Sequence, residues 1–316
     1  MKNKYLRLII GLSFLVFLVW FSGISNIWEH LKKIDLLMST LCIAILLVAQ
    51  AISSLRWQWI LAAEGVKIPL FTLFQSYMIG MFMNNLLPTS IGGDISKTYD
   101  IYRLTGDKAL SLTSVFFERF TGLVALLSLS WIGITFSLQT SPPVIYWTWF
   151  AINAGCVLML AAIFQGSWTE RLLLHLSEGR LQKVGRFLNL CYTKLAVYRK
   201  RKRLLAKLIV VSFPIQLGTI FIYQIIAVSI GIHLPFYFFL FSVPLITLIA
   251  LVPVTIGGLG VREGMTVLMF SAVGITQDVA VTMSLLYLVV SYVVSLVGGL
   301  FLQYALKASL PRCPWR

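Results

Sequence analysis

Long runs of apolar residues dominate the chain and set its expected architecture. A helix needs about 20 apolar residues to cross a bilayer, and six segments approach or exceed that length. They span about residues 5–24, 36–61, 109–137, 143–164, 204–231 and 279–305. Two further apolar segments, about 69–87 and 236–252, each lead into a proline followed by paired glycines. The pattern predicts an all-α integral membrane protein with about six full transmembrane helices and two interrupted segments.

The two interruptions share a sequence motif. Residues 88–93 read Pro-Thr-Ser-Ile-Gly-Gly, and residues 253–258 read Pro-Val-Thr-Ile-Gly-Gly. The match continues past the glycines, because Lys97 and Arg262 both lie nine residues after the proline. Turns favour proline, glycine, serine and threonine, so two turns of similar composition are the alternative. The shared isoleucine and the matched basic residue favour an internal repeat, whose broken helices would mark a transport site.

The charge distribution indicates which side of the membrane each segment faces. The formal net charge is +15, and much of the excess lies in one loop, residues 165–207. Such a loop should be cytoplasmic, as should both termini. Topology and anionic lipid headgroups explain this charge, so nucleic-acid binding is not expected. Apolar residues recur every three or four positions within the loop, which predicts an amphipathic helix on the inner membrane surface.

Counting membrane crossings from this loop determines on which side of the membrane each interrupted segment must begin and end. The two helices that precede the loop must begin and end on the cytoplasmic side. Segment 69–87 therefore has to return to that side through a turn at 88–94. The stretch 236–278 must likewise begin and finish outside, turning at 253–260. We expect both to be re-entrant hairpins, which is permitted where polar backbone at membrane depth faces protein or a wet cavity.

The whole chain, residues 1–316, is then expected to form one polytopic membrane domain. One hairpin opens from the cytoplasm and the other from outside. The two halves should therefore form an inverted repeat, with copies at about 36–137 and 204–305. The basic N-terminal segment resembles a signal peptide, but no small-residue cleavage site follows, so the first helix should be retained. We expect the cytoplasmic membrane as the location.

Residues that often bind metals or cofactors are scattered. The four cysteines have no metal-binding spacing, and the three histidines are isolated from one another. We therefore expect neither a metal nor a cofactor. The chain also lacks a Walker motif, so ATP is not expected to drive its activity.

The two interrupted segments carry the candidate site. Paired glycines permit positive φ and close approach of a ligand to the backbone. A helix that starts beyond them directs free N–H groups towards an anion, and Lys97 and Arg262 add full charges. The site should therefore prefer a negatively charged group such as a phosphate. The candidate substrate-binding residues are Asn84, Asn85, Pro88, Gly92, Gly93, Asp94, Lys97, Glu118, Arg119, Pro253, Gly257, Gly258, Gly260, Arg262 and Glu263.

Several of these residues have a structural alternative. Glu118 and Arg119 lie inside an apolar span, where ionisable residues usually face a partner or a cavity. Instead of contacting substrate, they could neutralise Arg262 and Glu263. Asp94 could cap the helix that follows the glycines, or act as a coupling carboxylate. The asparagines before the first proline could line the cavity, or satisfy backbone groups that the broken helix frees.

Arg56 stands with Trp57 and Trp59 near the expected cytoplasmic end of the second span. A long basic side chain can extend towards the headgroups, and tryptophans favour the interface. We interpret this group as a membrane anchor first, with a headgroup role second.

These residues resemble a known family, the flippase-like membrane proteins named for the transmembrane part of lysylphosphatidylglycerol synthase. The resemblance lies in Asn85–Pro88, Gly92–Asp94, Glu118-Arg119, Gly122-Leu123, Pro253–Glu263 and Arg56-Trp57, and it covers nearly the whole chain. It implies a polytopic bacterial or archaeal membrane protein that moves or handles a lipid with a modified headgroup. Lys97 stands where the family more often has arginine. The soluble aminoacyl-transfer domain of the full-length synthases is missing, so lysyl transfer is not expected.

Two functions remain open at this point. The first is a lipid transporter, a flippase or scramblase, whose partners are membrane lipids. Its cargo would be an anionic lipid that is headgroup-modified or linked to polyprenyl phosphate. The second is a membrane subunit or accessory of a lipid headgroup- or glycosyl-transferase, with a lipid-modifying enzyme as its partner. The sequence offers no strong nucleophile–base pair or sugar-nucleotide motif to support an enzyme.

Overall fold

The computed structural model describes residues 36–86, 92–137, 143–164, 201–251 and 260–309. Their helices are α3 (Leu36–Ala63), α4 (Leu70–Leu86), α5 (Gly92–Thr105), α6 (Lys108–Ser137), α7 (Pro143–Phe164), α10 (Lys202–Ser229), α11 (Phe236–Leu251), α12 (Val261–Ser271) and α13 (Gln277–Ser309). Four of them, α3, α6, α10 and α13, are long and apolar enough to cross a membrane. The chain is an all-α integral membrane protein, as the apolar pattern predicted.

Most predicted helices lie within a few residues of the observed ones. The interrupted segments correspond to α4 and α11, and the motifs are followed by the short helices α5 and α12, whose ends the apolar pattern did not predict. The expected helix at 5–24 and nearly all of the basic loop lie outside the described residues. So do four of the candidate site residues, namely Pro88, Pro253, Gly257 and Gly258.

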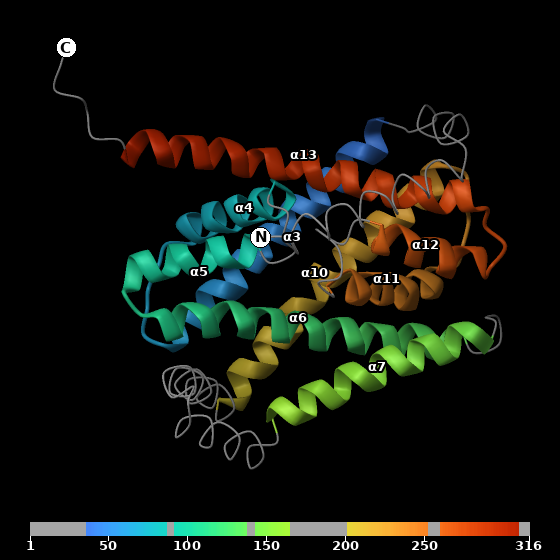
Figure 1. Cartoon of the computed structure of the whole chain (residues 1–316), viewed down its shortest axis with the longest axis horizontal. Helices are drawn as coiled ribbons and strands as arrows, with labels where there is room; N and C mark the ends of the chain where they lie inside the picture. The colour runs from blue at the N-terminus through green and yellow to red at the C-terminus, as the bar shows by residue number, and fades with distance from the viewer. Residues whose placement is uncertain (1–35, 87–91, 138–142, 165–200, 252–259, 310–316) are drawn as a thin grey trace, which may run out of the picture.

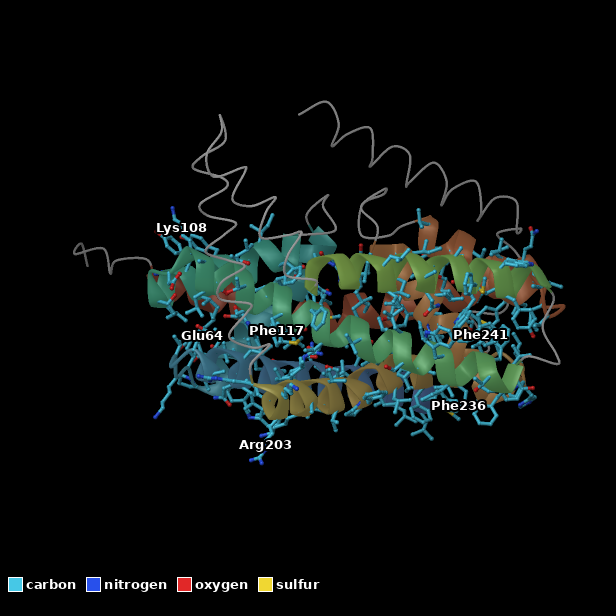
Figure 2. All side chains as sticks on the ribbon, turned by 90° about the horizontal axis from the view of Figure 1, so that it is seen from below. Glu64, Lys108, Phe117, Arg203, Phe236 and Phe241 are labelled. Carbon is cyan, nitrogen blue, oxygen red and sulfur yellow. The ribbon has the colours of Figure 1, made fainter. Side chains whose placement is uncertain are left out.

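The helices are arranged around the antiparallel pair α3 and α10. Arg201, directly before α10, donates from Nη1 to the carbonyl oxygen of Ala63 at the end of α3, at 2.7 Å. Figure 1 shows α4 and α5 side by side at one end of the molecule, and α11 and α12 at the other end. In the view of Figure 2, Glu64, Lys108 and Arg203 lie towards the first end, whereas Phe236 and Phe241 lie towards the second.

The helix contacts have an internal correspondence. When α3, α4, α5 and α6 are exchanged in order for α10, α11, α12 and α13, each principal contact maps onto another. The α4–α13 contact maps onto α11–α6, α4–α5 onto α11–α12, and α5–α6 onto α12–α13. The contact between α3 and α10 maps onto itself. This correspondence supports the repeat expected from the shared motif.

Two glycines make equivalent close helix contacts. A Cβ on Gly133 in α6 would lie 2.6 Å from the backbone nitrogen of Phe241 in α11. A Cβ on Gly298 in α13 would overlap the carbonyl group of Met78 in α4. In lipid, helices associate through close packing rather than through a hydrophobic driving force, so small residues at such contacts are valuable. The two glycines are 165 residues apart, the same separation as the two motif prolines.

The first helix of each half also ends in the same way. Gly65 after α3 has φ of 82°, and Gly231 after α10 has φ of 85°, a conformation that glycine adopts without a Cβ penalty. After each glycine, the next backbone N–H donates to the carbonyl oxygen five residues earlier, from Val66 to Leu61 and from Ile232 to Ala227. Both are Schellman-type ends, which pair carbonyls that the helix leaves free.

The two ends of the molecule bury different numbers of charged side chains. The largest apolar cluster lies around α11 and α12, where the ring of Phe238 meets those of Phe241 and Phe270 edge to face. The buried charged residue of α12 is Glu263, whereas towards α4 and α5 the buried side chains include three charged ones, Arg56, Lys97 and Glu118. Because charges inside a membrane protein are costly, this cluster is the leading candidate for a site.

Candidate functional site

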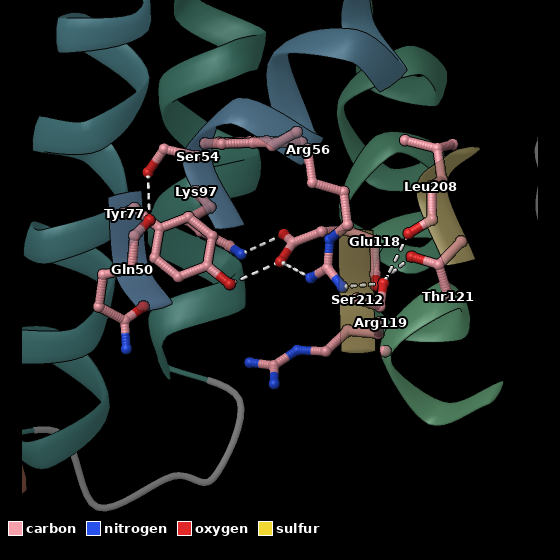
Figure 3. A network of polar contacts seen from close by, with 12 residues as sticks. Gln50, Ser54, Arg56, Tyr77, Lys97, Glu118, Arg119, Thr121, Leu208 and Ser212 are labelled. Carbon is pink, nitrogen blue, oxygen red and sulfur yellow. Dashed lines mark hydrogen bonds and ion pairs between the residues drawn. The ribbon is translucent and has the colours of Figure 1, made fainter. Parts of the chain in front are cut away.

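Glu118 in α6 is the centre of a buried ion-pair network. Its Oε1 atom lies 2.9 Å from Nη2 of Arg56 in α3 and accepts a hydrogen bond from the hydroxyl of Tyr77 in α4 at 2.5 Å. Its Oε2 atom lies 2.5 Å from Nζ of Lys97 in α5. Figure 3 shows these three side chains converging on the carboxylate from different helices. The network therefore joins all four helices of the first half.

The network buries more positive than negative charge. Arg56, Lys97 and Glu118 are 4%, 2% and 1% exposed, so two cations share one carboxylate away from solvent. Lys97 Nζ also lies 4.1 Å from the centre of the Tyr77 ring, a cation–π contact that partly replaces lost hydration. Inside low-dielectric surroundings an unbalanced charge interacts strongly, so this position attracts an anion.

Arg56 still has an unused donor. Its Nη1 donates to the Ser212 hydroxyl of α10 at 2.6 Å, whereas its buried Nε has no hydrogen-bond partner within the described part of the chain. A buried donor without an acceptor is uncommon in folded proteins and calls for a partner. Arg56 thus connects the two halves of the molecule and retains capacity to bind an anion.

Arg56 and Glu118 line a cavity of about 340 Å³. Its polar and charged lining residues are Gln50, Ser53, Arg56, Tyr77, Glu118, Arg119, Gln216 and Thr247. Its other lining residues are Phe116, Phe120, Gly122, Leu123, Leu126, Ile215 and Leu251. The walls come from α3, α4 and α6 of the first half and from α10 and α11 of the second. The cavity is therefore amphipathic and lies between the two halves, where a transport site was expected.

A second ion pair adjoins this cavity. Arg119, which lines it, places Nη2 2.9 Å from Oδ1 of Asp94 in the first turn of α5. The side chains of this pair are 49% and 23% exposed, so the pair is far more accessible than the Glu118 network. An aspartate in a first turn also interacts favourably with the helix dipole. The structure thus gives Asp94 an ion-pair partner that the capping and coupling alternatives did not include.

The second half has its own polar cluster, around Glu263. This fully buried carboxylate accepts a hydrogen bond from the backbone N–H of Gly260 at 2.6 Å, at the start of α12. Its other oxygen lies 2.9 Å from Nη2 of Arg262 and accepts from the Ser284 hydroxyl at 3.1 Å. The guanidinium of Arg262 lies 5.6 Å from the centre of the Tyr287 ring. Arg262 and Lys97 thus each have a carboxylate partner and an aromatic contact of their own. In the cluster of Arg262, however, one arginine faces one glutamate, so the charges cancel.

The expected pairing between the two halves is wrong. Glu118 and Arg119 were expected, if structural, to neutralise Arg262 and Glu263. Instead each charged residue has its ion-pair partner in its own half. The reason is topological, because α5 supplies Lys97 and Asp94 directly beside the Glu118-Arg119 segment of α6. Each of these ion pairs therefore lies within one half of the molecule.

The glycines of the motifs also differ in their roles. Gly92 and Gly93 belong to α5, and only Gly260 among the described motif glycines has positive φ, at 80°. A Cβ on Gly93 would overlap the carbonyl oxygen of Gly80 in α4. Gly92 and Gly93 thus do not use the positive φ that glycine permits. Gly93 instead allows close packing of α4 against α5.

The remaining candidate residues do not line the described cavity. Asn84 and Asn85 are half-buried in the last turn of α4. Asn84 is adjacent to Gly93, and the buried Nδ2 of Asn85 has no hydrogen-bond partner among the described residues. Within those residues, no group of three histidine, cysteine or acidic side chains is placed to hold a metal.

Arg56 is the main residue that the sequence interpretation misplaced. The prediction that its side chain extends towards the membrane surface is wrong, because it is buried and paired with Glu118. Tyr77 and Gln216, which also line the cavity, were not selected. The sequence did contain a signal for two of these residues. Arg56 lies seven residues before the end of α3 and Gln216 in the middle of α10, and polar residues within apolar spans often mark a site.

Comparisons with known proteins give relatives over nearly the whole chain. A family described as Lysylphosphatidylglycerol synthase TM region matches residues 6–299. A UPF0104 membrane protein of Pyrococcus horikoshii is 23% identical, with 94% of this chain and 96% of its own length covered. One from Methanothermobacter thermautotrophicus is 24% identical, with 96% of each covered. One from Methanocaldococcus jannaschii is 26% identical, with 74% of this chain and 98% of its own length covered. No solved structure matches the chain significantly.

Proposed function

Because the chain belongs to the family of the lysylphosphatidylglycerol synthase transmembrane region, we propose that it transports an anionic lipid between the leaflets of the cytoplasmic membrane. The lipid phosphate would enter the cavity between the two halves, while the acyl chains stay in the bilayer. The membrane location and the helical architecture follow from the long apolar helices of the chain. The cargo, the transport activity and the orientation are the proposal.

The observation that carries this proposal is the unbalanced charge beside the cavity. Arg56 and Lys97 share the single carboxylate of Glu118, and the Nε of Arg56 has no partner among the described residues. A guanidinium is well suited to a phosphate because its planar fork of donors matches two phosphate oxygens. The adjoining apolar wall suits the part of a lipid next to its headgroup.

In this account, Glu118 holds the binding position when no substrate is present. Its carboxylate neutralises one cation and orients Arg56, so the guanidinium is positioned before the lipid arrives. A phosphate entering from the cavity would bind Arg56 and Arg119 directly. Lys97, which does not line the cavity, would add positive charge from the opposite side of Glu118.

Alternating access would follow from the two halves. The α4–α5 and α11–α12 pairs lie at opposite ends of the molecule, and the cavity lies between the halves that contain them. We propose that they belong to hairpins opening to opposite sides, which is the geometry of an inverted repeat. Movement of one half against the other would then expose the cavity first to one side and then to the other. The driving force would be an ion gradient or the lipid gradient itself.

The test is lipid exchange by the purified protein in proteoliposomes. A fluorescent anionic phospholipid in the inner leaflet should become accessible to an impermeant quencher faster than in protein-free vesicles. A parallel assay should detect no chemical turnover of the headgroup. Turnover without exchange would instead support a role in a lipid headgroup- or glycosyl-transferase. Vesicles with and without protein that behave identically in both assays would contradict the transport proposal.

A further inference from the structure

We propose, building on the transport function above, that the accepted headgroup carries hydroxyl groups beside its phosphate and no amine. The ligand would be a lipid phosphodiester with a polyol, such as glycerol or a sugar. The cavity lining supplies charge for the phosphate, amide and hydroxyl groups for the polyol, and no available carboxylate for an ammonium group.

The acidic residues of the cavity support this inference. Within the described part of the chain, Glu118 is the only carboxylate that lines the cavity. Both of its oxygens are already engaged, by Arg56 and Tyr77 on one side and by Lys97 on the other. The turn sequences 87–91 and 252–259 contain no aspartate or glutamate either.

An ammonium group would therefore enter an unfavourable environment. It would lose its hydration without gaining an anionic partner, which is costly at membrane depth. It would also lie beside the guanidinium group of Arg56, which shares its one carboxylate with Lys97 and therefore repels it, whereas Arg119 is already paired with Asp94. The rings of Phe116 and Phe120 attract cations only weakly compared with a carboxylate. The lining thus disfavours aminoacylated and ethanolamine headgroups.

The neutral polar lining suits hydroxyl groups. The amides of Gln50 and Gln216 and the hydroxyls of Ser53 and Thr247 come from α3, α10 and α11 and line the same cavity. A polyol hydroxyl both donates and accepts, and an amide offers both kinds of partner. Sites that hydrogen-bond a hydroxyl discriminate strongly against analogues that lack it.

The size of the cavity fits a headgroup alone. A volume of about 340 Å³ lies at the lower end of the range for pockets that hold small molecules. Leu123, Leu126 and Leu251 form part of its apolar wall. A phosphate with one small polyol can enter, and the acyl chains would continue along that wall into the bilayer.

The test compares headgroups in one vesicle system. Purified protein is reconstituted in phosphatidylcholine vesicles that contain a trace of labelled phosphatidylglycerol, phosphatidylethanolamine or lysylated phosphatidylglycerol. We expect exchange of phosphatidylglycerol at least about tenfold faster than that of either amine-bearing lipid. Equal exchange of the three would overturn the headgroup inference and leave lipid transport standing, whereas no exchange of any lipid would overturn the transport proposal itself.

Soluble glycerol 3-phosphate provides the second arm, because it combines a phosphate with hydroxyl groups and has no acyl chains. Labelled glycerol 3-phosphate should not accumulate in the vesicles. Uptake of it without lipid exchange would show that the site serves a soluble polyol phosphate, which would contradict the transport of lipids.

Gln216→Glu tests the lining directly, because it adds the carboxylate that an ammonium group requires. We expect it to slow phosphatidylglycerol exchange about tenfold and to shift the preference towards the amine-bearing lipids. Gln277→Glu is the matched control, since Gln277 is exposed at the start of α13 and does not line the cavity. It should leave both rates unchanged. An unchanged preference in Gln216→Glu, with the protein folded, would overturn the proposed lining.

Discussion

The carboxylate of Glu118 accepts contacts from Arg56, Tyr77 and Lys97, and all of these side chains except that of Tyr77 are deeply buried. Buried ion pairs seldom add net stability, because desolvating the charges offsets their attraction. A net positive cluster inside a membrane protein is even less favourable. Its presence is therefore better explained by the need to bind an anion than by stability.

The first prediction compares two carboxylate-to-amide changes at the residue scale. Glu118→Gln leaves two buried cations without their anion, so it should reduce the free energy of unfolding by about 3–5 kcal/mol. Asp94→Asn removes the partner of the more exposed Arg119 and should cost no more than about 1 kcal/mol, since solvent screens that pair. Thermal unfolding in detergent measures both. Equal losses would show that burial does not distinguish the two pairs.

At the scale of helices, two close contacts between the halves depend on glycines. Gly133 lets α6 approach the backbone of α11, and Gly298 lets α13 approach that of α4. The long apolar helices could be predicted from the sequence, because the thickness of the bilayer sets how many consecutive apolar residues a spanning helix needs. These contacts could not be predicted, since nothing in the local sequence indicates which of the many glycines faces another helix. They became visible only when the helices were placed together.

The second prediction tests these contacts with three glycine-to-alanine variants. Gly133→Ala and Gly298→Ala should each destabilise the protein, because the new methyl group overlaps the backbone of the neighbouring helix. We expect losses of about 1–3 kcal/mol in the free energy of unfolding. Gly155→Ala in α7 is the control, since its Cβ would meet no atom within 4 Å. That change should be neutral or stabilising by up to about 1 kcal/mol. A loss in the control equal to those of the test variants would refute the packing argument.

The site was harder to predict than the helices, because the residues that contact each other there are far apart along the sequence. Lys97, Glu118 and Arg119 could be selected because charges within apolar spans are conspicuous. The partner of Glu118 in α3, Arg56, is 62 residues away, and the Ser212 contact spans 156 residues. The first pairing depends on how the helices of the first half pack and the second on how the two halves meet, so the sequence alone suggested a membrane anchor instead. The alternative that paired Glu118-Arg119 with the second motif failed because α5 supplies Lys97 and Asp94 as nearer partners.

At the scale of the whole molecule, lipid transport as proposed requires that the two halves have opposite orientations in the membrane. The corresponding helix contacts, the matched helix ends at Gly65 and Gly231, and the shared motif all support a repeat. The basic loop at 165–207 supplies the expected orientation. The loop between α3 and α4 should then be cytoplasmic, and the loop between α10 and α11 should lie outside.

The third prediction concerns these two loops. Lys67 and His233 are exposed in them and can be replaced one at a time by cysteine, in a background without the four native cysteines. An impermeant thiol reagent applied to intact cells should label the cysteine at position 233 and leave that at position 67 unmodified. Permeabilised cells should give labelling at both. If intact cells label both positions, or only position 67, the proposed topology is wrong.

The most direct test of the transport site is lipid exchange by Arg56→Gln. Arg56 lines the cavity, and its buried Nε has no hydrogen-bond partner in the described part of the chain. A charge-assisted contact contributes about 1.5–3 kcal/mol. The variant should therefore exchange anionic lipid roughly ten- to a hundredfold more slowly per folded protein. Arg203→Gln, at an exposed arginine near the start of α10, should match the wild type. Wild-type exchange by a folded Arg56→Gln protein would contradict the central claim that this arginine binds the transported lipid.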